Sequence, residues 1–515
     1  MEQFLLTLAG GMGFLADPMV WVLLIPGALI GVTVGALPGI GATVAYGLML
    51  PFTVMMEPGH AVAFLLSIAV GNQFGNSIPA ILIGLPGSPA TILTVADGFT
   101  LHKRGETGLA LGIAYVAALG GQAISILFFI ALVVPLAGLT YVFLAPELFS
   151  LYVLGMVAIV SLTGRNIAKG FVAATFGLLI GVVGLDPVTL SPRFDLGFRV
   201  LRNGLDPEPV VIGLLAVSEL FRQARQTFQW SELSGALVTR FPPLSAIRRC
   251  VPAMMIGTVT GTLVGAIPGA GTTPAAMISY QQARLISRRP DEFGKGSIEG
   301  IAANEAAQNA ANSGELIPTL GLGLPVSGTA VLLLSALTIQ GFVPGPSLTR
   351  NSPELLGAAV AGLLGGTVVL LVLGWWLSRA MMKIVTINRS VVIVLCLALV
   401  ILGVYALSRQ VFDVFLCLAC GVVGYFMSRY GYSVAAAGLA AILSAEFERT
   451  LRQGLNLFDN DLWLFLSRPI TATVLLVAFG ILVFGILRIR REAKLAKAER
   501  ESQRSTALFG HAGEG

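Results

Sequence analysis

The sequence predicts an all-α, polytopic membrane protein built from two internal repeats with broken helices. The first observation is composition: 55% of the 515 residues are hydrophobic and 11% are charged, with a mean hydropathy of +0.85. Soluble domains carry about 25% charged residues. The second is that apolar runs of about 20 residues, long enough to span a bilayer, recur from Trp21 to Leu487. The third is a glycine and proline pattern that occurs twice.

That pattern consists of four glycines at every fourth position, a proline before the last of them, and a glycine and a threonine after it. The first copy is Gly27, Gly31, Gly35, Pro38, Gly39, Gly41 and Thr43. The second copy is Gly257, Gly261, Gly265, Pro268, Gly269, Gly271 and Thr273. Proline removes a backbone donor and glycine lets the backbone turn, so each copy predicts a helix broken at a Pro-Gly corner. We interpret Gly27, Gly31, Gly257 and Gly261 as close-packing faces.

A second pair of matched blocks follows in the same order. The segment SIPAILIGLPGS (77–88) matches ELIPTLGLGLPVS (315–327), with two prolines, one glycine and one serine in register. We interpret the two matches as an internal duplication. The parity of the spans between the copies decides between inverted and parallel repeats, and we expect the inverted arrangement. Breaks at membrane depth must be buried in protein or line a wet cavity, because unpaired backbone groups in lipid cost several kcal/mol.

In chain order, the apolar segments predict about 11 to 13 spans or half-spans. The fourteen apolar segments, of which 209–220 is only a short piece, lie at 18–38, 40–55, 61–85, 109–136, 147–162, 171–185, 209–220, 251–279, 298–314, 355–382, 391–407, 411–427, 434–443 and 469–487. We divide the chain into a first repeat (1–220), a charged linker (221–250), the core of a second repeat (251–350), further transmembrane helices (351–488) and a basic tail (489–515).

The net charge of +5 comes from short basic patches between apolar segments, which set membrane orientation and give no reason to expect nucleic-acid binding. The basic stretch 488–504 places the C-terminus in the cytoplasm. The basic loop 97–107 is expected on the same side, with Asp97 as a solvated loop acid. The loop 281–297 is strongly basic as well. No nucleotide-binding P-loop is present, and three histidines cannot build a His-rich metal site, so we predict no enzyme and no resident cofactor.

Polar side chains gather just before the later breaks of each half. Amides and a carboxylate inside membrane segments either hydrogen-bond between helices or mark a substrate or ion pathway. Glu305 is the strongest candidate, lying either in a wet cavity or near an interface. In secondary transporters the N-terminus of a half-helix faces the anion, while unwound carbonyls coordinate Na⁺. The candidate substrate- and ion-binding residues are therefore Pro38, Gly39, Gly41, Thr43, Asn72, Asn76, Ser77, Pro86, Gly87, Ser88, Pro268, Gly269, Gly271, Thr272, Thr273, Glu305, Asn309, Asn312, Ser313, Pro325 and Ser327.

At these residues the chain resembles a known family. GALPGIGATVAYGLMLP and GNQFGNSIPAILIGLPGSPATILTVADGFTLHKRGETGLALG are similar to the first signature of the large membrane subunit (TctA) of the tripartite tricarboxylate transporters. GAIPGAGTTPAAMISY, FGKGSIEGIAANEAAQNAANSGELIPTLGLGLPVSG and GFVPGP resemble the second. Two positions depart from the family: Asn76 stands where a second glycine is usual, and Val326 where Pro-Gly is usual. These departures concern the lining of the site and the choice of substrate.

The resemblance implies a permease that works with a small four-helix membrane subunit and a periplasmic substrate-binding protein. It implies import of organic carboxylates, driven by a Na⁺ or H⁺ gradient, across the inner membrane of a Gram-negative bacterium. The alternative is a stand-alone ion-coupled carrier for organic anions. An intramembrane enzyme is disfavoured because the three histidines, His60, His102 and His511, lie at segment ends or in the tail.

Overall fold

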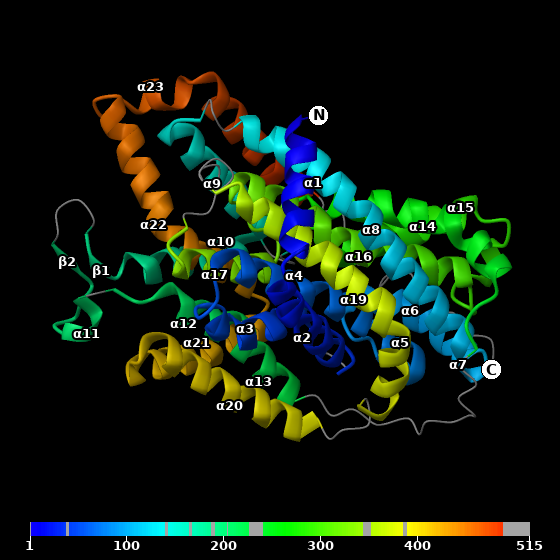
Figure 1. The fold of residues 1–515 in the computed structure, drawn as a ribbon. Coiled ribbons are helices and arrows are strands. Elements are labelled where there is room, and N and C mark those ends of the chain that lie inside the picture. The colour runs from blue at the N-terminus through cyan, green and yellow to red at the C-terminus, as the bar shows by residue number, and fades with distance from the viewer. Residues whose placement is uncertain are drawn as a thin grey trace, which may run out of the picture.

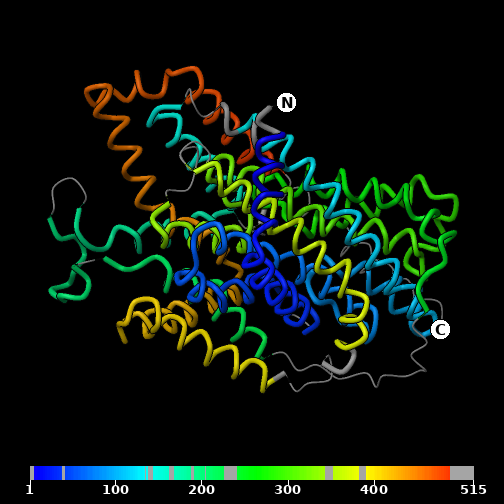
Figure 2. The backbone as a smooth tube through the Cα atoms, viewed as in Figure 1, coloured from blue at the N-terminus to red at the C-terminus, as the bar shows by residue number. Residues whose placement is uncertain are grey.

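The computed structural model describes residues 2–37, 41–139, 143–163, 167–186, 191–202, 204–225, 240–342, 352–384 and 389–487. Nearly all of them are helical, which confirms the predicted all-α class (Figures 1 and 2). Within these residues the strands are the short antiparallel pair β1 (Gly184–Leu185) and β2 (Pro192–Arg193), with Gly184 opposite Arg193. The architecture is therefore one of packed helices.

The helices of the first half are α1 (Glu2–Leu15), α2 (Pro18–Gly35), α3 (Ala42–Thr53), α4 (Pro58–Gly75), α5 (Ser77–Leu82), η1 (Pro89–Thr91), α6 (Ile92–Thr94), η2 (Val95–Phe99), α7 (Thr100–Lys103), α8 (Thr107–Leu139), α9 (Ala145–Thr163), α10 (Ile167–Val182), α11 (Arg199–Arg202), α12 (Pro207–Val211), η4 (Ile212–Val217) and α13 (Ser218–Ala224). Those that follow are α14 (Leu244–Gly265), α15 (Thr272–Ile286), η5 (Pro290–Glu292), α16 (Ile298–Leu322), α17 (Gly328–Ile339), α19 (Glu354–Ile384), α20 (Arg389–Ser408), α21 (Val411–Arg429), α22 (Val434–Leu457), α23 (Leu462–Ser467) and a last helix over Pro469–Leu487.

Seven helices in the described ranges are long and apolar enough to cross a bilayer, and five shorter apolar helices accompany them. The spans are Pro18–Gly35, Pro58–Leu82, Thr107–Val133, Glu354–Met381, Ser390–Ser408, Val411–Arg429 and Pro469–Leu487. This pattern fits a multi-pass membrane protein. The count of 11 to 13 spans or half-spans and the division into two repeats stay predictions.

The most extensive helix contacts are those of α2 with α4 and of α14 with α16, and α8 also lies along α16. Figure 1 shows α14, α15 and α16 side by side at one end, and α9, α10 and α22 toward the other. The glycine stripes lie in the contacts between the paired helices. A Cβ added at Gly31 would overlap the carbonyl oxygen of Ile68, and one at Gly261 would overlap that of Ala307. The interpretation of these glycines as close-packing residues is confirmed.

The two pairs also end alike. Helix α2 stops at Gly35 and α3 starts at Ala42, while α14 stops at Gly265 and α15 starts at Thr272. The predicted break at Pro268 is confirmed, because that residue lies between α14 and α15. The first break is seen as the gap between α2 and α3, but Pro38 and Gly39 themselves lie outside the described residues.

Three elements differ from the sequence prediction. The N-terminal helix α1 was not expected; it packs on α19, where Gly11 leaves room for Val360. Helix α16 runs through Pro318 and ends four residues later, because Gly323 turns the backbone into the left-handed conformation. The Pro318 carbonyl then accepts the N–H of Leu324 (3.1 Å). Helix α22 extends to Leu457, well past the apolar stretch that ends at residue 443.

Asp97 joins the two halves at the basic loops. The expectation of a solvated acid is wrong, since the side chain is fully buried. It accepts hydrogen bonds from the N–H groups of Gly296 and Ser297 (2.9 Å each) and from the Tyr280 hydroxyl (2.8 Å). Burial raises the pKa of the Asp97 carboxyl, and these hydrogen bonds oppose the rise. Close by, Arg104 donates to the carbonyl of Lys295 (2.8 Å), so loops 97–107 and 281–297 lie on one side of the molecule.

Candidate functional site

A cavity of about 330 Å³ lies where the breaks of the two halves meet. Its wall combines the start of α3, the polar end of α4, the start of η1, the loop before α15 and the turn before α17, with one residue each from α9, α16 and α22. The lining residues are Gly41, Ala42, Thr43, Asn72, Gln73, Asn76, Ser88, Pro89, Ile159, Gly269, Ala270, Gly271, Thr272, Thr273, Glu315, Val326, Ser327, Gly328, Thr329 and Ala435. Segments almost 300 residues apart in sequence thus share one site.

The breaks contact one another directly. The Gly269 N–H donates to the carbonyl of Val326 (3.2 Å), which ties the two breaks of the second half together. A Cβ at Gly328 would lie 3.4 Å from Thr43, so the first half meets the second here. Gly269 (φ +80°) and Gly271 (φ +65°) adopt backbone conformations that L side chains rarely occupy. Glycine is required at both positions for the chain to turn into α15.

Three helices begin at the wall of this cavity. They are α3, whose first residues Ala42 and Thr43 line it, α15 with Thr272 and Thr273, and α17 with its N-cap Ser327. The first N–H groups of a helix have no intrahelical partner, and the aligned peptide dipoles place about half a positive charge there. Three helix N-termini around one cavity favour the binding of an anion there.

Buried polar atoms without partners also face the cavity. Asn72 is fully buried and Asn76 is 2% exposed. The Asn76 Nδ2 donates to Asn72 Oδ1 (3.3 Å), yet Asn72 Nδ2, Asn76 Oδ1 and the Ser88 hydroxyl have no hydrogen-bond partner within the described part of the chain. Leaving a buried polar group unsatisfied costs about 1 to 3 kcal/mol. A polar ligand or water in the cavity would remove that cost.

Glu315 is the functional candidate that the sequence analysis did not select. It lines the cavity, is 6% exposed, and accepts a hydrogen bond from the Ser327 hydroxyl (2.7 Å). Among the described lining residues it is the one ionisable side chain. Two signals point to it: it stands in the position that matches Asn76 when the later blocks are aligned, and it is a carboxylate inside a membrane segment.

The structure brings ten of the predicted site residues to the cavity. These are Gly41, Thr43, Asn72, Asn76, Ser88, Gly269, Gly271, Thr272, Thr273 and Ser327. It places nine others off the wall, namely Ser77, Pro86, Gly87, Pro268, Glu305, Asn309, Asn312, Ser313 and Pro325. Pro38 and Gly39 lie outside the described residues. That any of them binds substrate or ion stays a prediction.

Four of the residues off the wall have other hydrogen-bond partners. Glu305, fully buried, accepts hydrogen bonds from the hydroxyls of Ser77 and Thr94 and so fastens α16 to the first half. The Ser313 hydroxyl accepts from Gln122 Nε2 (2.7 Å) on α8. These contacts are the interhelical hydrogen bonding expected of the alternative role. Asn309 instead bonds within α16, donating to the Glu305 carbonyl one turn back (3.0 Å). In the described ranges no three His, Cys, Asp or Glu side chains are grouped to hold a metal ion.

Comparison with known proteins leads to the same family that the sequence motifs resemble. A family model described as "Tripartite tricarboxylate transporter TctA family" matches residues 21–439. An Agrobacterium vitis protein described as "Uncharacterized 52.8 kDa protein in TAR-I ttuC' 3'region" is 31% identical over 461 residues, covering 90% of this chain and 92% of that protein. Another from the same organism, "Uncharacterized protein in TAR-II ttuC' 3'region", is 31% identical over 227 residues, covering 44% and 94%. No solved structure matches the chain. The chain therefore belongs to the TctA family of tripartite tricarboxylate transporters, as a multi-pass membrane permease component.

Proposed function

We propose that this chain is the large permease subunit of a binding-protein-dependent secondary transporter that imports tricarboxylate- or dicarboxylate-like organic anions. The observation that carries the proposal is the convergence of three helix N-termini and unpaired buried amide atoms on one cavity. A carboxylate oxygen accepts hydrogen bonds from free N–H groups and from the Asn72 amide. The cavity volume, about 330 Å³, falls within the range of small-molecule sites.

The scaffold of the site is, in this proposal, a duplicated and inverted pair of helix hairpins. The contacts support it. Gly27 approaches the Phe64 carbonyl and Gly257 that of Ala303, and the same register joins the later stripe glycines to α4 and α16. Gly84 (φ +67°), just after α5, and Gly323 (φ +71°), at the end of α16, both adopt left-handed backbone conformations. Two halves folded on one plan, facing each other across a cavity, form the architecture of many alternating-access carriers.

In this proposal, Glu315 couples the binding of the substrate to the binding of a cation. A carboxylate substrate and an ionised Glu315 would repel each other across this cavity, because both carry negative charge. Uptake of one cation removes that repulsion, either as a proton on Glu315 or as Na⁺ held by its carboxylate with the hydroxyls of Ser327 and Thr329. Substrate and cation then favour each other's binding, which is the requirement for symport.

The partners and the location follow from family membership. We propose that a small four-helix membrane subunit and a periplasmic binding protein complete the transporter in the bacterial inner membrane. The C-terminus would then face the cytoplasm, on the side of loops 97–107 and 281–297.

Reconstitution tests the proposal. Proteoliposomes that hold this chain, the small subunit and the binding protein should accumulate labelled citrate-like or dicarboxylate compounds when an inward Na⁺ or H⁺ gradient is imposed. Omitting the binding protein should abolish accumulation. Full accumulation by this chain alone would establish the stand-alone carrier instead, and current without saturable uptake would identify a channel.

Replacing each of two buried asparagines distinguishes a residue that binds substrate from one that only packs between helices. Asn72→Ala is expected to raise the KM for uptake about tenfold or more, because a hydrogen bond to a charged group contributes about 1.5 to 3 kcal/mol. Asn309→Ala, one of the sequence candidates that lies off the wall, should leave KM unchanged. Substrate titration of initial rates in proteoliposomes measures both. Equal KM values for Asn72→Ala and wild type would contradict the cavity assignment.

A further inference from the structure

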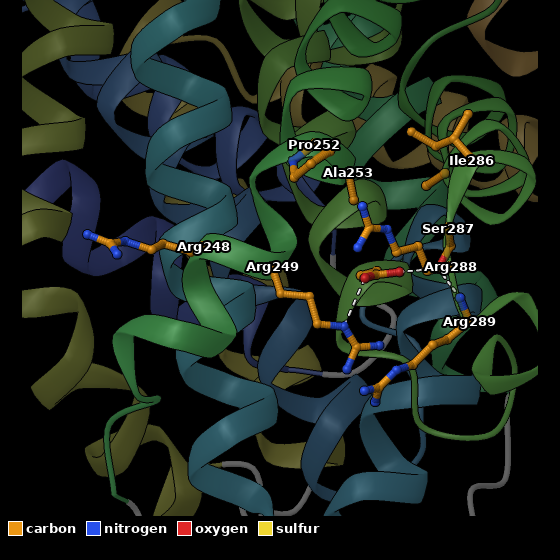
Figure 3. Close-up of a pocket in the computed structure, with 10 residues that line it drawn as sticks. Arg248, Arg249, Pro252, Ala253, Ile286, Ser287, Arg288 and Arg289 are labelled. Carbon is orange, nitrogen blue, oxygen red and sulfur yellow. Dashed lines mark hydrogen bonds and ion pairs between the residues drawn. The ribbon is translucent and has the colours of Figure 1, made fainter.

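A second, larger cavity lies at the far end of α14 and α15, away from the helix breaks. It has a volume of about 440 Å³, and its lining includes arginines from the second turn of α14 and from the segment just after α15. Figure 3 shows the Arg249 and Arg289 side chains extending toward each other from opposite sides, whereas Arg248 points away. Glu299 also lines the cavity and accepts a hydrogen bond from Arg249 Nε (2.9 Å).

The charges around this cavity do not balance. Arg249 is paired with Glu299 and Glu292, and Arg289 with the same Glu292 (3.1 Å). Arg288 also lines the cavity and is exposed, and within the described ranges it has no hydrogen bond or ion pair. The guanidinium groups of Arg249, Arg288 and Arg289 thus outnumber the two carboxylates, those of Glu292 and Glu299. They leave a surplus of positive charge that a phosphate group would neutralise, and guanidinium forks bind phosphate oxygens bidentately.

An apolar stripe leads away from the arginines along the outer face of α14. Its residues, Val251, Met255, Val259 and Leu263, are 39% to 55% exposed and recur at every fourth position. Twelve residues of helix rise about 18 Å, which is slightly more than one leaflet of a hydrocarbon core about 30 Å thick. At the end of α15 beside the cavity, Ile286 is 59% exposed as well.

We infer that this cavity and stripe form a binding site for an anionic phospholipid. The headgroup phosphate lies among Arg249, Arg288 and Arg289, and the acyl chains lie along the α14 stripe. The stripe begins at Val251, next to the cavity residue Pro252. A free phosphate would use the arginines but not the stripe, so the position of the stripe beside the cavity favours the lipid. The site is on the side of the basic loops, which is the leaflet where lipid surface charge attracts Lys and Arg.

Lipid binding to the purified full-length chain tests this. Phosphatidylglycerol and phosphatidylcholine with identical acyl chains are titrated against the protein in mild detergent, and bound lipid is counted by native mass spectrometry. Phosphatidylglycerol should bind at least tenfold more tightly. Arg288→Gln should weaken its binding about fivefold, since one Arg near an anionic headgroup is worth about that factor, and should leave phosphatidylcholine unchanged.

Arg284→Gln is the matched control, because Arg284 is an exposed arginine of the same helix end that does not line the cavity. Arg288 has no hydrogen-bond or ion-pair partner among the described residues, so its replacement removes no such contact there. Equal binding of the two lipids, or equal losses in the two variants, would overturn the proposal. Displacement of phosphatidylglycerol by millimolar inorganic phosphate would identify a soluble anion as the ligand and overturn the lipid assignment. The proposal is independent of the transported substrate.

Discussion

Glu315→Gln is expected to uncouple transport from the cation gradient while the protein stays folded. Glutamine keeps the size of the side chain, and its Oε1 can still accept from the Ser327 hydroxyl, so the packing around α16 survives. What is lost is the negative charge that the coupling cation neutralises. One coupled charge moving through 100 mV supplies about 2.3 kcal/mol, equivalent to about fiftyfold accumulation. Steady-state accumulation at that potential should therefore fall about fiftyfold.

Tracer uptake into proteoliposomes with an imposed gradient measures this loss, and thermal unfolding in detergent checks the fold. Glu305→Gln is the matched control, since Glu305 is a second buried glutamate on the same helix that does not line the cavity. It should lower stability, because Ser77 and Thr94 donate to its carboxylate. The folded fraction should retain coupled uptake. Wild-type accumulation by Glu315→Gln would remove Glu315 from the coupling mechanism without contradicting a carboxylate substrate.

The contrast between these two glutamates shows how far the sequence alone could be taken. A sequence reveals which residues share a helix face, and on that basis Glu305 stood out among its neighbouring amides. It does not reveal which face meets a cavity. The hydroxyls that satisfy Glu305 come from residues more than 200 positions earlier, so its packing role was invisible before the fold was known.

The helix breaks were more predictable because their causes are local. Proline and glycine act on the backbone at their own positions, so the break before α15 and the positive φ angles of Gly269 and Gly271 follow from the residues there. Pro318 shows the limit of that reasoning. A proline interrupts one intrahelical hydrogen bond, yet α16 continues past it, since the surrounding helices hold the segment in place and Gly323 supplies the actual end.

Gly31→Ala is expected to lower the free energy of unfolding by about 1 to 3 kcal/mol or more, the usual cost of overpacking, because Gly31 lies in the glycine stripe of α2. A Cβ at Gly31 would overlap the carbonyl oxygen of Ile68 and also approach backbone atoms of Gly71 and Asn72. Backbone cannot rotate out of the way as a flexible side chain can, so α2 and α4 must separate. Gly261→Ala should act in the same direction at the α14–α16 contact, where the overlap is with the carbonyl of Ala307.

Gly13→Ala and Gly480→Ala are the controls, because both glycines are helical and a Cβ at either meets nothing within 4 Å. There alanine should be neutral or stabilising, since it favours a helix over glycine by about 0.5 to 1 kcal/mol. Thermal unfolding of the four purified variants gives the comparison. Moving α2 away from α4 should also disturb the cavity, because the Asn72 carbonyl lies against Gly35, one turn beyond Gly31, and Asn72 also lines the cavity. Gly31→Ala should therefore raise the KM for uptake as well as lower stability. If Gly31→Ala were instead as stable as Gly13→Ala, the stripe would not hold α2 and α4 together.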